Sequence, residues 1–265
     1  TIFHEVMRSL YTSEEAMAPD FFFGSQEAEK SLTPLKHITR DYIQSWIDRE
    51  DVIRTKVRSL IEHELNLVEI SGRNLVVTDV IVRYVVKTLR SDLKILEESG
   101  KESFEILGRE LRVSGVFHGF RFKGFIDRLD AFSADEVRVV DYKTGRVLDD
   151  DIFIDDDNAK DIAQKIFAPD VKDRPKIALQ FYIYDLLAKD RKEAKDRKMY
   201  NCVYSTSRLF GELPKAVPVN RIFFDAMSGN LSAMLDEMCD PEVGFRRTGD
   251  EHVCGYCDFK TICGR

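Results

Sequence analysis

Three residues near the middle of the chain have the types and the spacing of a divalent-metal site. Asp127 lies in the segment GFIDRLD, and Asp141 and Lys143 lie in the segment VVDYKTG that follows it. Carboxylate oxygens are the ligands that Mg²⁺ and Mn²⁺ prefer, and such an ion acidifies a bound water and neutralises phosphate charge. A neighbouring lysine stabilises charge that develops in a transition state. The three residues therefore indicate the chemistry of phosphodiester hydrolysis.

The two segments have the composition of β-strands that could bring these residues together. We expect Gly124–Asp127 to end one strand and Arg138–Lys143 to form another. Alternate residues of a strand share a face, so Asp141 and Lys143 should point the same way. If the strands are neighbours, Asp127 reaches the same point, and the main-chain carbonyl of Tyr142 offers a further oxygen ligand.

A salt-bridged sheet surface is the alternative explanation of this pattern. In that case the carboxylates of GFIDRLD would face Asp141 and Lys143 across an exposed sheet, and the spacing alone does not exclude it. The valines of residues 137–140 predict a buried strand instead, where unpaired acids are costly. Gly124 and Gly145 bracket the site and permit a close approach of the backbone. Both features favour the metal site.

The rest of the chain predicts an α/β core with a helical part before it. Apolar residues at helical spacing predict helices over 2–10, about 41–67 and about 77–98. Short β-rich stretches then predict a meander of strands over 104–113, 115–118, 120–130 and 136–142. After an acidic and solvated loop over 149–157, we expect a helix over 177–189, a strand over 198–205 and a helix over 223–238.

Composition and length fit a single globular domain of 265 residues, with a mainly helical part (1–100), an α/β core (101–240) and a cysteine-rich tail (241–265). The net charge of −7 argues against a protein that coats nucleic acid, but not against a cleft enzyme with acidic metal ligands. No apolar run approaches the ~20 residues of a membrane span, and no signal peptide is visible. We expect a cytoplasmic protein without membrane contact. Because Thr1 leads straight into a helical pattern, we interpret the chain as a fragment of a longer polypeptide.

The five cysteines do not have the spacing of a secreted disulfide framework. Cys254, Cys257 and Cys263 cluster in the last residues, whereas Cys202 and Cys239 are isolated. Such clustering suggests metal ligation in a reducing compartment.

Five elements in order resemble the RecB-type branch of the PD-(D/E)xK nucleases, including its AddB-like members. They span nearly the whole chain: FHEV with His4, GFIDRLD, DYKTG, Gln180-x3-Tyr184, and Cys254-x2-Cys257-x5-Cys263. The resemblance implies a restriction-endonuclease-like fold, with a mixed central sheet flanked by helices. It also implies an Mg²⁺- or Mn²⁺-dependent deoxyribonuclease, an exonuclease of a helicase–nuclease system in double-strand-break repair. Its substrate would be single-stranded DNA or duplex ends, and a helicase region or subunit would be its partner.

The resemblance also assigns roles to individual residues. His4, Asp127, Asp141 and the carbonyl of Tyr142 would hold the metal, and Lys143 would assist the nucleophile. In the same way, Gln180 and Tyr184 would position the DNA strand, Glu110 in GREL would be an additional acid, and the three tail cysteines would ligate a [4Fe–4S] cluster.

Each of these roles has a structural alternative. His4 could be an ordinary core histidine, and Glu110 a surface residue of a strand. Gln180 and Tyr184 could form only the polar edge of a core helix, with Tyr182 competing for their role. The remaining histidines match no family element, and we expect them to be structural: His37, His63, His118 and His252.

The chain departs from the family in two respects. The fourth cluster cysteine comes from upstream of the His4 helix in the iron–sulfur members, so Cys202 or Cys239 would have to replace it, or the three thiolates would bind zinc. No GxxxxGK[ST] phosphate loop is present, so no helicase motor is visible. Two alternatives to the repair exonuclease remain open: an inactive nuclease-like domain that binds DNA ends or acts as a scaffold, and a CRISPR-associated RecB-like exonuclease.

Overall fold

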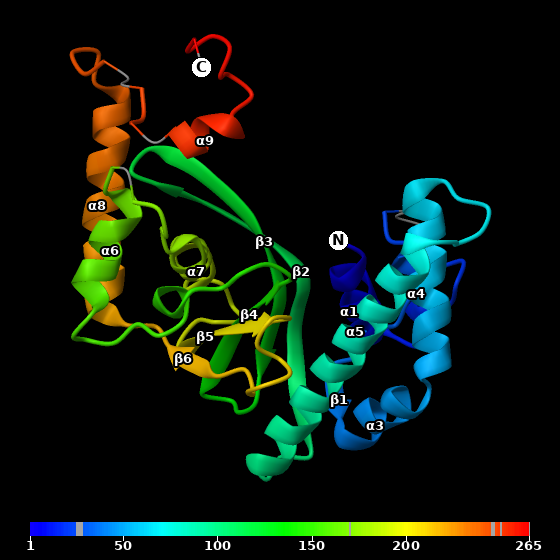
Figure 1. The fold of residues 1–265 in the computed structure, drawn as a ribbon. Coiled ribbons are helices and arrows are strands. Elements are labelled where there is room, and N and C mark those ends of the chain that lie inside the picture. Colours follow the sequence, from blue (N-terminus) through cyan, green and yellow to red (C-terminus); the bar gives the residue numbers. More distant parts are fainter. Residues whose placement is uncertain (25–28, 170, 245–246, 250, 265) are drawn as a thin grey trace.

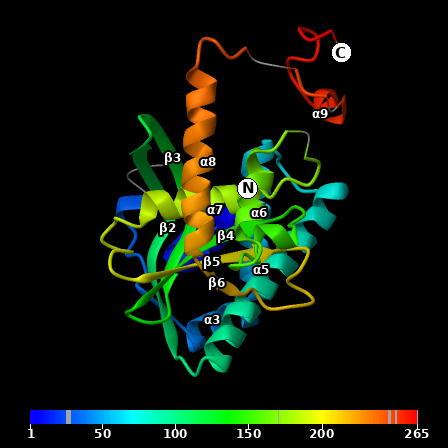
Figure 2. The ribbon, with the colours of Figure 1, turned by 90° about the vertical axis from the view of Figure 1, so that its left-hand side faces the viewer.

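The chain folds into three layers, with a sheet between two groups of helices (Figure 1). The computed structural model describes residues 1–24, 29–169, 171–244, 247–249 and 251–264. Helices from the first hundred residues cover one face of the sheet, and helices that follow the strands cover the other face (Figures 1 and 2). The described residues include no helix that is both long and apolar enough to cross a lipid bilayer.

The sheet has six strands among the described residues, in the order β1-β2-β3-β4-β5-β6. Neighbouring strands run antiparallel except β4 and β5, which run parallel. The strands are β1 (His37–Thr39), β2 (Ser103–Phe117), β3 (Phe120–Ala131), β4 (Glu136–Lys143), β5 (Lys198–Ser205) and β6 (Ala216–Pro218). A mixed sheet flanked by helices on both faces is the architecture expected of a restriction-endonuclease-like fold, and it confirms that prediction.

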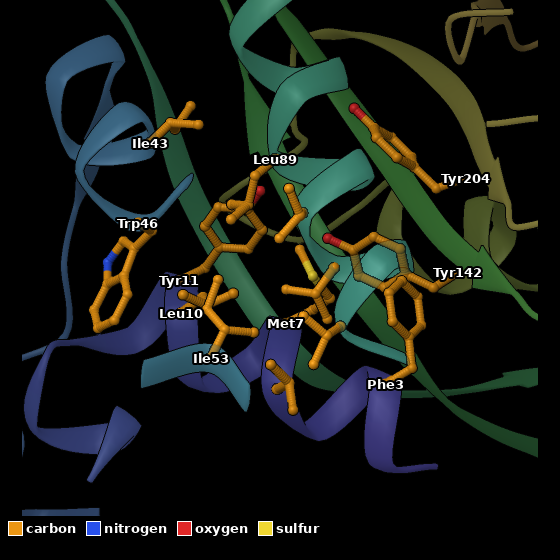
Figure 3. Close-up of a cluster of buried hydrophobic side chains, with 14 of the residues drawn as sticks. Phe3, Met7, Leu10, Tyr11, Ile43, Trp46, Ile53, Leu89, Tyr142 and Tyr204 are labelled. Carbon is orange, nitrogen blue, oxygen red and sulfur yellow. The ribbon is translucent and has the colours of Figure 1, made fainter. Parts of the chain in front are cut away.

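The N-terminal helices build the larger core against this sheet. They are α1 (Ile2–Thr12), α3 (Arg40–Asp48), α4 (Glu50–Leu65) and α5 (Arg73–Glu98), with a short 3₁₀ turn, η1 (Glu15–Met17), after α1. Phe3, Met7 and Leu10 recur at helical spacing on α1 and are buried against Tyr142 of β4 and Tyr204 of β5 (Figure 3). Burying each such side chain contributes about 1.5–3 kcal/mol, so α1 is fixed firmly on the sheet.

The predicted helix over 41–67 is wrong, because two helices occupy this stretch. The helical path breaks at Arg49, whose backbone takes φ −104° and ψ 46°. The Arg49 guanidinium lies 4.0 Å from the centroid of the Trp46 ring and donates to the carbonyl of Ser45, which holds the bend. The bend lets Trp46 and Ile53 enter the same core (Figure 3). No glycine or proline marks the bend, so the apolar periodicity alone predicts one uninterrupted helix.

Three helices cover the other face of the sheet: α6 (Ala159–Phe167), α7 (Lys176–Ala188) and α8 (Arg221–Cys239). Helix α7 is buried on several sides because it packs on the sheet and also against α6 and α8. The carboxylate of Asp151 accepts hydrogen bonds from the main-chain N–H groups of Ile177 and Ala178 in its first turn. Asp151 is therefore buried, which corrects our prediction that residues 149–157 form only a solvated loop.

The strand meander is simpler than predicted. A single strand, β2 (Ser103–Phe117), replaces the two predicted over 104–113 and 115–118, and a turn at His118 and Gly119, both with positive φ, joins it to β3. Helix α6 and the three-residue edge strands β1 and β6 were not predicted. A short helix, α9 (Glu251–Gly255), lies in the tail.

Candidate active site

The strands β3 and β4 separate where they carry the two aspartates. Their ladder ends at the pair Arg128 and Val140, so Asp127 and Asp141 occupy the next positions. Instead of a main-chain bond, the Oδ2 atom of Asp127 accepts a hydrogen bond of 2.7 Å from the main-chain N–H of Tyr142. The carbonyl of Tyr142 is thereby left for other partners at the open end of the two strands.

His4 reaches this open end from α1. Its Nε2 donates to the carbonyl oxygen of Tyr142 at 2.9 Å and lies 3.3 Å from Oδ2 of Asp127. The other ring nitrogen, Nδ1, is hydrogen-bonded to the hydroxyl of Thr1. Burial opposes protonation of His4, but the hydrogen bond to Asp127 and its charge outweigh burial and raise the pKa of the imidazole. His4 thus contacts both strands of the site.

Asp141 is buried and faces α7 and Lys143. The Nζ atom of Lys143 lies 2.7 Å from Oδ2 of Asp141, and Nε2 of Gln180 donates to Oδ1 at 3.0 Å. The lysine is not aligned as a donor, so the buried Oδ2 atom makes an ion pair but no well-directed hydrogen bond. Burial, and next the charge of Asp127, raise the pKa of Asp141 to about 6, although Lys143 opposes the shift.

Helix α7 supplies polar side chains that border the site. Gln180 accepts a hydrogen bond of 2.7 Å from Nζ of Lys143 and donates one of 2.6 Å to the hydroxyl of Tyr184, one turn further along. Gly124 permits this arrangement, because a Cβ there would lie 2.9 Å from the Tyr184 ring. Tyr182 packs instead with α6 and α8, so it does not compete for this place.

Glu110 lies beside Asp127 in the neighbouring strand. The pairs Arg109–Arg128 and Leu111–Ile126 flank the two residues in the β2–β3 ladder. Glu110 is half-buried, and its φ of 43° is unusual for a residue other than glycine. Burial, and next the charge of Asp127, raise the pKa of its carboxyl group. The structure therefore brings Glu110 to the predicted site, in a strained backbone conformation typical of functional positions.

We call His4, Glu110, Asp127, Asp141 and Lys143 the carboxylate site. Its three carboxylates face one lysine, which leaves a formal charge of −2 when all three are ionised and His4 is neutral. Burial and the charge of Asp127 raise the pKa of both Glu110 and Asp141, and Lys143 is the one lysine among the described residues of the site. This excess of negative charge is what a bound divalent cation would neutralise.

The donor atoms of the site have spacings that suit such a cation. Adjacent ligands of an octahedral Mg²⁺ ion, bound at about 2.1 Å, lie about 3 Å apart. Nε2 of His4 lies at 2.9 Å from the Tyr142 carbonyl oxygen and at 3.3 Å from Oδ2 of Asp127. Among the described residues, no three side chains of His, Cys, Asp or Glu already converge on one point. One of the three donor atoms is the main-chain carbonyl of Tyr142 rather than a side chain. Asp141 is paired with Lys143 and would have to turn away from it to become a further ligand.

Sequence analysis missed a second group of buried charges behind the site, which we call the arginine network: Asp92, Arg128, Asp130 and Arg138. Arg128 binds both carboxylate oxygens of Asp92 at 2.8 and 3.1 Å, and Arg138 binds both oxygens of Asp130 at 2.7 and 2.8 Å. Asp92 lies on α5 in line with the buried Leu89 and Leu96. An acid at an apolar helix position was the available signal.

The tail cysteines are not brought together in the part of the chain that the structure describes. Cys254 is buried, Cys257 is half-buried and Cys263 is exposed, and Cys202 lies in the sheet core rather than beside the tail. The described residues thus contain no gathered set of thiolates for a cluster or a zinc ion.

The other histidines lie outside the carboxylate site. His63 stacks on Phe22 and His118 donates to Asp236, while His37 starts the edge strand β1. The side chain of His252 lies outside the described residues.

Comparison with known protein families gives a match over nearly the whole chain. The model of the PD-(D/E)XK nuclease superfamily matches residues 1–264. A search of curated proteins found no match. The family match covers every residue of the carboxylate site.

Proposed function

Because the chain belongs to the PD-(D/E)XK nuclease superfamily, we propose that the carboxylate site hydrolyses phosphodiester bonds of DNA with Mg²⁺ or Mn²⁺. His4, Asp127, Asp141 and the carbonyl of Tyr142 would hold the ion. Membership of the family implies a nuclease, and nucleases of this superfamily typically use these ions. The assignment of the individual residues is our proposal.

One observation carries this proposal: a histidine nitrogen, a carboxylate oxygen and a carbonyl oxygen lie at ligand spacing beside a second buried aspartate. A purely structural set of ion pairs would balance its charges inside the protein. Here the carboxylates outnumber the cations, and the pKa of Asp141 is raised rather than lowered. Both features fit a site that is completed by a divalent cation.

The bound ion would acidify a water molecule and neutralise charge on the scissile phosphate. Lys143 would act on the phosphate if Asp141, which is now paired with it, were a ligand of the ion, because Nζ would then be free of that carboxylate. Gln180 keeps Nζ within 2.7 Å of its Oε1 atom, so the freed lysine remains aimed into the site. There its ammonium group donates to a phosphate oxygen and stabilises the negative charge that grows in the transition state.

The remaining site residues would position the substrate. The hydroxyl of Tyr184 accepts from Gln180 and can donate to a phosphate of the bound strand. Glu110 would accept a hydrogen bond from a water beside the ion, because its carboxyl group lies next to Asp127 and is only half-buried.

We further propose that the chain is the nuclease part of a RecB- or AddB-like exonuclease that acts in double-strand-break repair in the cytoplasm. The ordered motifs from His4 to the tail cysteines support this narrower assignment. It would act on single-stranded DNA or duplex ends together with a helicase region or subunit. Among the described residues no three metal-ligating side chains are gathered, so we retain the [4Fe–4S] cluster only as a proposal for a longer protein.

Degradation of linear DNA with Mn²⁺ tests the proposed activity. We expect the parent protein and Asp185→Asn to release nucleotides, and Asp141→Asn to release almost none. Asp185 is a matched control, because it is a buried aspartate of α7 whose carboxylate accepts from Asn201, which lies outside the carboxylate site. Equal and negligible activity in all three proteins would contradict the proposal and favour the inactive, DNA-end-binding alternative.

A further inference from the structure

Beyond the carboxylate site, β2 and β3 continue as a two-stranded ribbon that arches over α7 (Figure 1). Three cross-strand pairs of this ribbon point to the same side: Arg112–Phe125, Ser114–Lys123 and Val116–Arg121. All six residues are exposed. We call them the ribbon face.

The opposite face of the ribbon is covered, which holds the ribbon in place. Gly115 and Gly124 lie so close to α7 that a Cβ at either would come within 2.9 Å of a side chain of that helix. Phe117 and Phe122 pack with residues of α6 and α8. At the turn, His118 donates to Asp236 of α8 at 2.6 Å. The ribbon therefore presents one open face from a fixed support.

The ribbon face is positively charged in a chain that carries a net charge of −7. Arg112, Arg121 and Lys123 make no ion pair or side-chain hydrogen bond with any other described residue, and the face contains no carboxylate. Arg54, a partly exposed cation of α4, instead binds Glu50 and Asp79. The charge of the ribbon face is thus left for a partner molecule.

Apolar groups lie among these cations. Phe125 is 53% exposed and Val116 is 70% exposed, so both leave apolar surface in contact with water. An exposed aromatic ring between basic side chains is the surface on which unpaired bases stack while their phosphates contact the cations. A duplex keeps its bases stacked on one another, so it would leave the Phe125 ring unused.

The ribbon face also begins at the carboxylate site. Phe125 precedes Asp127 by two residues, and Arg112 follows Glu110 by two residues. Two residues of a strand span about 6.8 Å, so the first cross-strand pair lies one such step from the carboxylates and the third lies about 20 Å away. A strand bound along the ribbon face would therefore have a phosphate within reach of the site.

We infer that the ribbon face binds single-stranded nucleic acid and leads it to the carboxylate site. Arg112, Lys123 and Arg121 contact successive phosphates, and one base stacks on Phe125. This inference rests on the proposed function and adds the surface that holds the substrate. It also assigns single strands, rather than duplexes, as the form that is bound next to the site.

Fluorescence anisotropy with a labelled oligothymidylate about a dozen nucleotides long, in buffer with EDTA, tests the inference. We expect the variant Arg112→Gln/Arg121→Gln/Lys123→Gln to weaken binding at least about 30-fold, and the slope of log affinity against log salt to fall by about 2, since each single-strand phosphate contact accounts for about 0.7. Phe125→Ala should weaken binding at least about 5-fold for single strands and leave duplex binding unchanged.

The control removes the same charge from another surface. Arg83→Gln/Arg90→Gln/Lys94→Gln changes three exposed cations of α5, and its binding should stay within about 3-fold of the parent. Thermal unfolding of each variant shows that it is folded. The inference is overturned if the parent does not bind the oligonucleotide, if the two triple variants behave alike, or if Phe125→Ala weakens duplex binding equally.

A separate assay distinguishes failure of the proposed function. Hydrolysis of bis(p-nitrophenyl) phosphate by the parent with Mn²⁺ depends on the carboxylate site, because this small diester does not span the ribbon. Absence of hydrolysis together with the expected binding pattern would reject the proposed function and leave the binding surface standing. Hydrolysis without the binding pattern would reject the ribbon face alone.

Discussion

The arginine network and the carboxylate site share strands β3 and β4, and their charges are balanced differently. In the arginine network two arginines face two aspartates, so the formal charges cancel. In the carboxylate site three carboxylates face Lys143. Burial removes charges of both groups from water, which is unfavourable. In the arginine network arginines of the same chain offset this cost, whereas the carboxylate site has more carboxylates than cations.

The pKa values of two aspartates express this difference. Burial would raise the pKa of Asp92, but the Arg128 guanidinium outweighs burial and holds that pKa below its usual value. At Asp141, burial and the charge of Asp127 outweigh Lys143, and the pKa rises to about 6. A buried acid with a lowered pKa serves the fold, whereas one with a raised pKa beside another acid indicates a site that requires a further cation.

Tyr142 connects the two groups. Its hydroxyl accepts from Arg128 at 3.0 Å, while its main-chain N–H donates to Asp127 and its carbonyl accepts from His4. Asp127 and Arg128 are also consecutive in the chain. The balanced network therefore fixes the position of the strands that carry the unbalanced site. The predictions below separate the two roles.

The largest effect should come from Asp141→Asn. We expect Mn²⁺-dependent hydrolysis of linear DNA to fall on the order of 10⁴-fold, because a ligand and its charge are lost. The midpoint of thermal unfolding should stay equal or rise, because repulsion with Asp127 disappears. A clear fall in the unfolding midpoint, of the kind expected for a variant of the arginine network, would contradict the distinction between the two groups.

Breaking the arginine network should affect stability instead. Arg128→Met leaves Asp92 buried without its main partner, and we expect the free energy of unfolding to fall by about 3–5 kcal/mol. Urea unfolding followed by circular dichroism measures this loss. Lys143→Met is the matched change in the carboxylate site, and should cost less than about 1 kcal/mol, since Lys143 is partly exposed. Similar losses in both variants would contradict the distinction.

Sequence analysis named the residues that the structure brings together in the carboxylate site, but not the arginine network that supports them. The valines and the alternating pattern of the two motif strands place Asp127, Asp141 and Lys143 on neighbouring strands, because such segments fold as buried strands in most contexts. The arginine network depends on Asp92, which lies on a helix 36 residues before Arg128, and such a long-range ion pair leaves only an acid at an apolar helix position as a signal in the sequence.

The missed elements have similar physical causes. The bend at Arg49 is held by a cation over an aromatic ring rather than by a helix-breaking residue. Edge strands β1 and β6 are too short to show a period of two, and they form because longer neighbours offer free main-chain groups. Asp151 was predicted to be solvated because its neighbours are acidic, yet it alone caps α7.

A third buried acid, Asp185, lies outside both groups and has no cation as a partner among the described residues. It tests whether an unpaired buried carboxylate lowers the stability of the fold when it ionises. Burial raises its pKa to about 7, although Asn201 donates to it. Between about pH 4 and pH 7 the folded state therefore holds a proton that the unfolded state has released, so stability falls as pH rises through this window and levels off above it. Asp185→Asn should be more stable than the parent at pH 8 by on the order of 2–3 kcal/mol.

Urea unfolding of the parent and of Asp185→Asn at pH 4 and pH 8 measures this difference. We expect the two proteins to have similar stability at pH 4, where Asp185 is protonated and resembles the amide. An advantage of the variant that is equal at both pH values would show that packing, rather than the charge of Asp185, is responsible.

The smallest effect should come from Gly124→Ala. The added Cβ meets the Tyr184 ring at 2.9 Å and must displace this ring, whose hydroxyl is bonded to Gln180, so we expect a loss of about 1–2 kcal/mol and a lower rate of hydrolysis. Gly145→Ala is the control, because its Cβ meets no atom within 4 Å and its φ is not positive. If both variants behave alike, the close approach of α7 does not matter to the site.

The central claim is that the carboxylate site binds a divalent cation through Asp127 and Asp141. Isothermal titration calorimetry with Mn²⁺ on the parent, Asp127→Asn, Asp141→Asn and Asp185→Asn tests it most directly. The account predicts that the parent and Asp185→Asn bind with the same affinity, and that each site variant binds at least about 10-fold more weakly. Mn²⁺ binding that is absent from the parent, or that is unchanged in both site variants, would contradict it.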